Sequence, residues 1–75
     1  MFLYLPVEQR LYSPYLGCYH TFGIESLLIT AQQNVQVAFI PDVSTDEATV
    51  SLIACRCTCG QLAPIHLLGI IEDSI

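Results

Sequence analysis

The sequence predicts an α+β fold, in which an antiparallel three-stranded β-meander is followed by two short α-helices packed on one face. Two observations support this prediction. Apolar and polar residues alternate over much of the first forty positions, as they do in half-buried strands. Beyond them, a segment beginning near residue 44 contains start and stop signals for two consecutive helices. We expect a single small α+β domain, 1–75.

Alternation with a period of two residues indicates the first two strands. The first is expected over residues 2–12, where Pro6 marks an edge strand or a bulge because proline has no N–H to donate to a ladder. The second is expected over residues 15–30, with Gly17 and Gly23 indicating a bulge or a close backbone approach. One face of this second strand carries Leu16, Cys18, His20, Phe22, Ile24 and Leu28.

A hairpin turn at residues 32–34 is expected to follow, because Asn34 tolerates a positive φ. The third strand then covers residues 35–40, and Pro41 ends it. Short connections between successive strands favour an antiparallel meander.

A capping box predicts where the first helix begins. In the pattern Ser-x-x-Glu, the Ser44 hydroxyl accepts a hydrogen bond from the Glu47 N–H, and the Glu47 carboxylate accepts one from the Ser44 N–H. Gly60 is the expected residue after the last turn, because helices commonly close with a glycine there. The first helix is therefore expected from about Thr45 to Cys59.

The second helix is expected to begin at Pro64, since proline suits the first turn of a helix, and to run to about Asp73. His66 lies in its first turn, where we expect a hydrogen bond that fixes the loop between the helices. The inward stripe of this helix is expected to consist of Leu67, Leu68, Ile71 and Ile75.

The first helix carries two apolar stripes on nearly opposite sides. One stripe, which we expect to pack on the sheet, contains Ala48, Leu52, Cys55 and Cys59. The other contains Val50, Ile53 and Cys57. This second stripe is either a surface for a partner or a face covered by the second helix or the N-terminal segment. The amphipathic side chains of Tyr15 and Tyr19 are further interface candidates on the sheet.

Composition favours association with another protein. Apolar residues make up 53% of the chain and charged residues only 12%, against roughly 25% in ordinary soluble domains. A 75-residue chain has room for only a small core, so self-association or binding to a protein partner is expected.

The net charge of −5 predicts repulsion from phosphate backbones, so no nucleic-acid binding is expected. The sequence has no apolar run long enough to cross a membrane, and its N-terminus lacks the features of a signal peptide. We therefore expect no membrane partner and a cytoplasmic location.

Four cysteines do not predict a disulfide framework here, because three of them, Cys55, Cys57 and Cys59, lie within little more than one turn of a helix, and disulfide geometry cannot join residues on opposite sides of a helix. We expect reduced thiols that act as small apolar residues. The alternative is a tetrahedral zinc site, in which Cys18 and His20 of the second strand meet Cys55 and Cys59 of the first helix. Our primary prediction contains no metal or other cofactor.

Three runs of residues carry a family resemblance: Tyr19–Ile24 (Tyr-His-Thr-Phe-Gly-Ile), Asp42–Asp46 (Asp-Val-Ser-Thr-Asp) and Leu62–Leu67 (Leu-Ala-Pro-Ile-His-Leu), followed by Glu72-Asp73. In these runs the chain resembles an uncharacterised family of clostridial and related bacteria, the domain of unknown function DUF6514. The resemblance covers residues 15–75. It implies a cytosolic setting in an anaerobe, and no activity or catalytic residue is established for that family.

These observations predict a small non-enzymatic module that binds itself or another protein through apolar surface. No nucleophile with an adjacent base, phosphate-binding loop or basic face is evident in the sequence. The alternative is a cysteine-based regulator that binds a metal or responds to oxidation. A small hydrolase or transferase would need a pocket that joins His20 or His66 to a cysteine.

Overall fold

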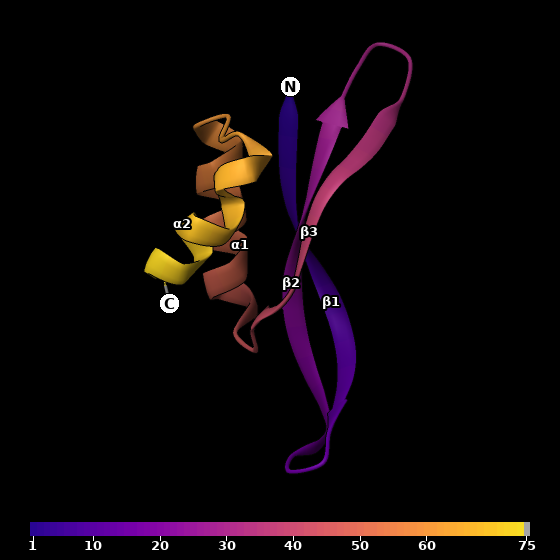
Figure 1. Ribbon diagram of the computed structural model, residues 1–75, viewed down its shortest axis with the longest axis vertical. Coiled ribbons are helices and arrows are strands. Elements are labelled where there is room, and N and C mark those ends of the chain that lie inside the picture. Colours follow the sequence, from indigo (N-terminus) through magenta and orange to yellow (C-terminus); the bar gives the residue numbers. More distant parts are fainter. Residues whose placement is uncertain (75) are drawn as a thin grey trace.

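A computed structural model describes residues 1–74 and confirms the predicted α+β architecture. Strands β1 (Phe2–Ser13), β2 (Gly17–Ile29) and β3 (Asn34–Ser44) form one antiparallel sheet in the order β1-β2-β3. Helix α1 (Glu47–Cys59), the 3₁₀ turn η1 (Pro64–His66) and helix α2 (Leu67–Ser74) follow. Figure 1 shows both helices on the same side of the sheet, so none of the elements in residues 1–74 covers its opposite face.

Pairing between β1 and β2 is regular along the whole of β1, from Phe2 opposite Leu28 to Ser13 opposite Gly17. The Ile29 N–H donates to the Met1 carbonyl at 2.8 Å, so odd-numbered residues of β1 direct their backbone groups to β2. Even-numbered residues, including Pro6, direct theirs to the outer edge of the sheet. The missing N–H of Pro6 therefore interrupts no ladder bond, which confirms the edge position expected from its chemistry.

The ladder between β2 and β3 is irregular, with register shifts between Phe22 and Ile24 and between Ser26 and Leu27 of β2. At the first shift, a Cβ added to Gly23 would lie 2.6 Å from the Ile40 carbonyl oxygen. The expected close backbone approach at Gly23 is therefore confirmed. Strand β3 continues past Pro41 to Ser44, so the prediction that Pro41 ends the strand was wrong. The bulge accommodates the proline.

The turn between β2 and β3 is closed by Thr30, whose hydroxyl donates to the Gln33 carbonyl at 2.7 Å and whose N–H donates to the same oxygen at 3.1 Å. Asn34 is the first residue of β3 and does not have the positive φ that we expected. Among residues 1–74, the non-glycine residues with positive φ are Asp42 and Gln61.

Asp46, rather than Ser44, caps the start of α1, so the predicted capping box was wrong. Asp46 Oδ1 accepts a hydrogen bond from the Ala48 N–H at 3.2 Å, and Asp46 Oδ2 accepts one from the Thr49 hydroxyl at 2.6 Å. Ser44 still belongs to β3, and its Oγ accepts from the Asp46 N–H at 3.1 Å. Glu47 is the first helical residue, where its negative charge complements the helix dipole.

Helix α1 ends in a Schellman arrangement. The Leu62 N–H donates to the Cys57 carbonyl at 3.0 Å, and the Gln61 N–H donates to the Thr58 carbonyl at 3.1 Å. Gly60 terminates the helix as predicted, but with a right-handed φ of −85°. The left-handed position belongs to Gln61, with φ of 48°.

The second helical segment begins at Pro64, as predicted, but its first turn is the 3₁₀ turn η1. Helix α2 then buries Leu67 and Ile71 and leaves Leu68 about half exposed, so Leu68 is not part of the inward stripe. Ile75, the last member of the expected stripe, lies outside the described residues. Neither α1 nor α2, the α-helices in residues 1–74, has the length and apolar character required to cross a membrane.

The core lies between α1 and the sheet, and α1 is oriented opposite to our prediction. Its buried residues are Val50, Ile53, Ala54 and Cys57. They pack with Tyr4 of β1, Ile24 of β2, and Leu67 and Ile71 of α2. The stripe expected to face the sheet is instead on the outside, where Leu52 is 53% exposed and Cys55 and Cys59 are exposed.

Candidate interaction surface

The face of the sheet away from the helices carries a continuous set of apolar side chains. Even-numbered residues of β1 and β2, such as Tyr4 and Ile24, point to the core, so odd-numbered residues point to the opposite face. We call this surface the open face. Its apolar members are Leu3, Leu5, Val7 and Leu11 of β1, Leu27 and Ile29 of β2, and Val37 and Phe39 of β3.

Glu25 lies at the centre of the open face, opposite Leu5 on β1 and Phe39 on β3. The Gln36 side-chain amide donates to Glu25 Oε2 at 3.3 Å. Glu25 is half-buried, whereas Val37 and Phe39 beside it are exposed. The open face is therefore apolar with a single carboxylate at its centre.

The two edges of the sheet differ, because side chains from the end of α1 satisfy the outer backbone groups of β1. The Gln61 side-chain oxygen accepts a hydrogen bond from the Phe2 N–H at 2.9 Å, and its amide nitrogen donates to the Phe2 carbonyl at 2.9 Å. The Thr58 hydroxyl accepts from the Tyr4 N–H at 2.9 Å. Farther along the same edge come Pro6 and the charged residues Glu8 and Arg10, which oppose pairing with another strand.

Along residues 34–40, the outer edge of β3 receives no side-chain hydrogen bond from the described residues, although a register shift opposite Ser26 and Leu27 interrupts its ladder with β2. Ala38 and Ile40 pair with even-numbered residues of β2, so the backbone groups of Phe39 point outward. Within the described part of the chain, no hydrogen bond reaches the backbone N–H or C=O of Phe39 from outside the sheet. Residues 34–40 carry no charge and no proline.

A cluster of hydrogen bonds fixes the bulge at Asp42, on the same side of the sheet as the open face. Asp42 Oδ1 accepts from the Thr21 hydroxyl at 2.7 Å, and Asp42 Oδ2 accepts from the Tyr19 hydroxyl at 2.9 Å. The Asp42 N–H donates to Gln9 Oε1 at 2.9 Å. The hydrogen bond to Asp42 raises the pKa of Tyr19, with smaller effects of burial and of the Asp42 charge. These bonds hold Asp42 at its unusual φ of 50°.

The two runs Tyr19–Ile24 and Asp42–Asp46 meet in this cluster. Tyr19 and Thr21 bind the Asp42 carboxylate, and Gly23 leaves room for the backbone of β3. Asp46 caps α1. These contacts hold the turn that leads from the sheet into α1.

The interface residues expected from the sequence are distributed differently from our prediction. Val50 is fully buried, and Ile53 and Cys57 are at most 6% exposed, so these three residues form core rather than a free surface. Tyr15 lies in the β1–β2 turn and is 96% exposed. Tyr19 is half-buried, and its hydroxyl is engaged by Asp42.

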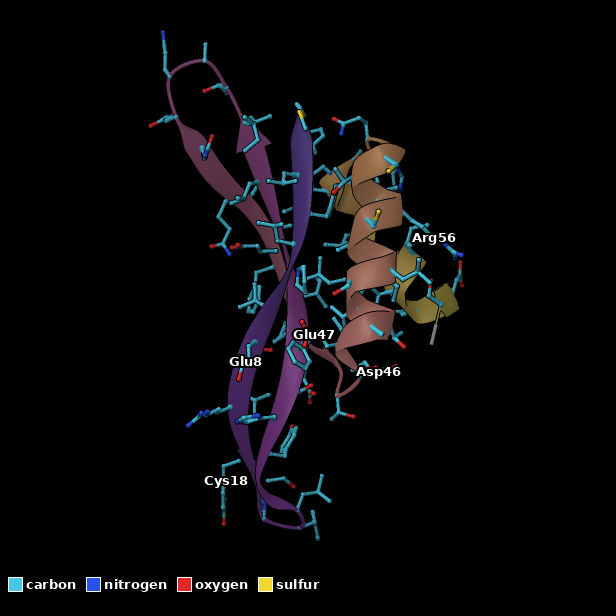
Figure 2. All side chains as sticks on the ribbon, turned by 180° about the vertical axis from the view of Figure 1, so that it is seen from behind. Glu8, Cys18, Asp46, Glu47 and Arg56 are labelled. Carbon is cyan, nitrogen blue, oxygen red and sulfur yellow. The ribbon has the colours of Figure 1, made fainter. Side chains whose placement is uncertain are left out.

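The structure does not bring the four candidate metal ligands together. Cys18 and His20 belong to the β1–β2 hairpin, whereas Cys55 and Cys59 belong to α1 beside Arg56. Figure 2 shows Cys18 near the opposite end of the molecule from Arg56. In residues 1–74, no three His, Cys, Asp or Glu side chains are grouped closely enough to hold a metal ion. The expected zinc geometry is therefore absent from this fold.

All four cysteines are free thiols, but only Cys57 is buried. Burial raises the pKa of Cys57. The expectation that the cysteines pack as small apolar residues is therefore correct for Cys57 and wrong for Cys18, Cys55 and Cys59, which are exposed. Cys55 and Cys59 are one turn apart on α1. A hydrogen bond with Cys55 and the charge of its thiolate raise the pKa of Cys59, with a smaller contribution from burial.

Cys18 and His20 line a shallow hollow with Arg10 and Tyr19, on the two-stranded end of the sheet. His20 Nδ1 lies 3.8 Å from Glu8 Oε1, beyond hydrogen-bonding distance, and both side chains are more than half exposed. A thiol nucleophile needs a hydrogen-bonded base held by a third group. This arrangement provides no such oriented set.

We expected a hydrogen bond from His66 to fix the loop between the helices, but its imidazole makes none with the described residues. Its backbone N–H donates to the Ala63 carbonyl at 3.0 Å, and its side chain is exposed without a hydrogen bond in the part of the chain described here. The loop is held instead from the core, where the buried Tyr4 hydroxyl donates to the Leu62 carbonyl. Pro64 supplies the first residue of the following turn.

An apolar cleft of about 290 Å³ separates the end of α1 from α2. It is lined by Arg56, Cys57, Gly60, Leu62, Ile70 and Ser74. Arg56 is its one charged residue, and the Ser74 hydroxyl already donates to the Ile70 carbonyl at 2.7 Å. A small-molecule site normally has several converging polar groups, which this cleft lacks.

Comparison of the chain with protein-family models, with curated proteins and with solved structures finds no match. The candidate surface therefore depends on geometry alone. Tyr19 was predicted as an interface residue on this side of the sheet, but the apolar residues of the open face were not, although the alternation in β1 already separated Leu3, Leu5 and Val7 from Tyr4. In the predicted fold, the two helices cover only one face of the sheet. The apolar residues at odd-numbered positions of β1 therefore already indicated an uncovered apolar face on the other side.

Proposed function

We propose that this protein is a non-enzymatic interaction module that binds a protein, either a second copy or another chain, through the open face and the adjoining edge of β3. The observation that carries the proposal is the one-sided arrangement of the fold. Both helices lie on the same side of the sheet (Figure 1). The apolar side chains at odd-numbered positions of the strands point to the other face.

The size of the open face supports this role. Residues 2–8 of β1 lie in the three-stranded part of the sheet, which spans about 23 Å along the strands and about 14 Å across them at ordinary strand spacings. This gives a footprint of roughly 300 Å², within the range of the largest apolar patches on monomeric proteins, which are often functional. The apolar fraction of 53% supports the same conclusion.

Charge supports a protein partner over a nucleic acid. The net charge is −5, and both basic residues, Arg10 and Arg56, lie away from the three-stranded part of the open face. A phosphate backbone would meet no positive patch there. The three exposed free thiols fit a reducing, cytoplasmic setting.

A cysteine-based metal-binding or redox-responsive regulator has less support. Its candidate ligands are divided between two distant parts of the fold, and the exposed pair Cys55 and Cys59 cannot form an unstrained disulfide one turn apart on a helix. Metal analysis of the reduced protein tests this alternative directly, and stoichiometric bound zinc would favour it over our proposal.

The test of the proposed function compares two lysine substitutions. Leu5→Lys places a charge at the centre of the open face, whereas Leu52→Lys places the same charge on the outer side of α1, where Leu52 is 53% exposed. Both chains are used as immobilised bait and studied by light scattering in solution. We expect Leu5→Lys to lose the associations that the wild-type chain makes through the open face, and Leu52→Lys to keep them.

Circular dichroism establishes that both variants are folded before binding is compared. The proposal is contradicted if the wild-type chain is strictly monomeric and the proteins it retains are the same for wild type and Leu5→Lys. It is equally contradicted if Leu52→Lys, and not Leu5→Lys, loses the association.

A further inference from the structure

We propose that the partner is a second copy of this chain, and that the two copies pair antiparallel through the outer edges of β3, over residues 34–40, about a two-fold axis. This inference rests on the proposed function and concerns the β3 edge alone, so the dimer is expected to persist in Leu5→Lys, whose charge lies on β1. The resulting dimer would contain one continuous six-stranded sheet, with the β3 strands at its centre and the β1 strands at its outer edges.

The two edges of the sheet differ in whether their outer backbone groups already have hydrogen-bond partners. At β1, Gln61 and Thr58 occupy the outer backbone groups of Phe2 and Tyr4, and Pro6 lacks an N–H. At β3, the outward backbone groups of Phe39 are unpaired in the described structure. A long uncharged edge strand is a template for pairing with another strand, and natural monomers usually block such edges.

The number of open edges decides whether association stops at a dimer or continues into a polymer. A chain with two open edges would add copies without limit, whereas a chain with one open edge can form only a closed pair through it. Antiparallel pairing of one segment with itself satisfies two-fold symmetry, because the N–H of Phe39 in each copy meets a carbonyl of the partner's segment. Protection at β1 and exposure at β3 therefore fit a dimer rather than a filament.

The distribution of charge also favours pairing through the β3 edge. The chain has a net charge of −5, but residues 34–40 carry none of it. Two copies can therefore approach along this edge without placing carboxylates opposite each other. Stacking of two open faces would instead enclose the central Glu25 of each copy in one apolar interface, where unpaired charges are costly. Edge pairing leaves Glu25 in contact with water.

The experiment changes the outward N–H of Phe39 and compares this change with loss of the side chain alone. Phe39→Pro removes the N–H, while Ala38 and Ile40 retain their bonds to β2. Phe39→Ala removes the ring and keeps the N–H. Sedimentation velocity over micromolar to millimolar concentration measures the dissociation constant. We expect wild type and Phe39→Ala to form dimers, and Phe39→Pro to raise the dissociation constant at least tenfold.

Two further measurements keep the test decisive if Phe39→Pro does not fold. Val37→Lys adds a charge to the same strand at a position that is 42% exposed, and we expect it to weaken the dimer at least tenfold. Because Val37 also belongs to the open face, its control is Leu5→Lys on β1, which we expect to keep the dimer. Amide hydrogen exchange on the wild-type chain needs no substitution. We expect protection of the Phe39 N–H to increase with protein concentration, while that of Ala38, already paired with β2, stays constant.

The inference is overturned if the wild-type chain stays monomeric at millimolar concentration, forms open-ended polymers, or dimerises with full strength as Phe39→Pro. A dimer that is lost in Leu5→Lys and kept in Phe39→Pro would show face stacking, which overturns edge pairing and leaves the proposed function standing. A monomer whose β3 edge binds an extended segment of a different protein would also overturn the second-copy inference alone.

Discussion

The side-chain amide of Gln61 pairs with the backbone of Phe2 as a neighbouring strand would, with hydrogen bonds of 2.9 Å to both the N–H and the carbonyl of that residue. The same amide donates to the Thr58 carbonyl at the end of α1. One side chain thus ties the end of the helix to the beginning of the sheet. It does so from a residue held in the left-handed conformation, with φ of 48°.

Substitutions of Gln61 should separate the stabilising effect of its side-chain hydrogen bonds from the destabilising effect of its left-handed backbone conformation. Gln61→Ala removes the hydrogen bonds and keeps the left-handed strain, so we expect the free energy of unfolding to fall by about 1–2 kcal/mol, given the modest net value of exposed hydrogen bonds. Gln61→Gly removes the same bonds and relieves the strain, which should recover about 1 kcal/mol. Urea unfolding measures both. If the two variants are equally stable, the strain assigned to Gln61 is wrong.

The strands were predictable from the sequence because a period of two leaves a clear signature. The face containing Phe22 and Ile24 was identified correctly, since these residues do pack toward the core. The ends were less predictable. Strand β3 passes Pro41 because a bulge places this residue outside the regular ladder, and the bulge depends on tertiary bonds between Asp42 and β2.

The orientation of α1 was not predicted, because both sides of the helix are apolar. The buried residues Val50, Ile53, Ala54 and Cys57 follow the spacing i, i+3, i+4, i+7, a signal that becomes visible once Ala54 is counted. Branched side chains at Val50 and Ile53 fill the core, and the small Ala54 permits close approach to the sheet. The prediction left Ala54 out of the stripe with Val50, Ile53 and Cys57, and instead placed the stripe containing Leu52 against the sheet.

Gly23 provides a test of the bulge. In Gly23→Ala the added methyl would lie 2.6 Å from the Ile40 carbonyl oxygen and 3.1 Å from Gln9 Oε1, so backbone must shift. We expect a loss of about 1–3 kcal/mol in the free energy of unfolding, the usual cost of overpacking. The matched control is Gly69→Ala in α2, where the new methyl would meet no atom within 4 Å apart from its chain neighbours and the adjacent backbone of its own helix. That variant should gain up to about 1 kcal/mol from helix propensity.

The opposite order of stability for these two alanine variants would contradict the register of β2 against β3. Thermal unfolding followed by circular dichroism is sufficient for the comparison, because both variants change one glycine to alanine and leave the charge of the chain unchanged.

Alkaline pH should destabilise the fold. The pKa values of Tyr4 and Tyr19 are raised from the ordinary value of 10.0, mainly by burial for Tyr4 and by the Asp42 hydrogen bond for Tyr19. The pKa of Cys57 is raised from 9.0 by burial. A raised pKa in the folded state gives stability that is complete below the unfolded pKa and lost as pH rises through the folded one. Stability should therefore decline above about pH 9.

Substitution of Asp42 isolates the contribution of Tyr19. In Asp42→Asn the acceptor loses its charge, so we expect the Tyr19 pKa to move down toward the ordinary range. Ring-proton NMR titration of Tyr19 in the wild-type and variant chains measures the change. An unchanged Tyr19 titration in this variant would rule out the bond between Tyr19 and Asp42 as the cause.

Thiol reactivity should distinguish Cys57 from the other three cysteines. Cys57 is buried among Val50, Ile53 and Leu67, whereas Cys18, Cys55 and Cys59 are exposed. An excess of an aromatic disulfide reagent should modify three thiols of the native chain rapidly and the fourth only on unfolding. In Cys57→Ala the slow phase should be absent. If all four thiols of the wild-type chain react rapidly, the face of α1 that carries Cys57 is not buried.

The two thiols on the outer side of α1 should also influence each other. Cys59 has a raised pKa because Cys55 hydrogen-bonds to it and, once ionised, repels a second thiolate. Removing that neighbour in Cys55→Ala should lower the Cys59 pKa, increase its thiolate fraction near neutral pH and accelerate its alkylation. Cys18, on the distant hairpin, serves as the internal control, and its alkylation rate should not change. Peptide mass analysis after timed alkylation assigns each rate to its residue. Equal acceleration of Cys18 and Cys59 would point to a general loosening of the fold, because a local effect of Cys55 cannot reach the β1–β2 hairpin.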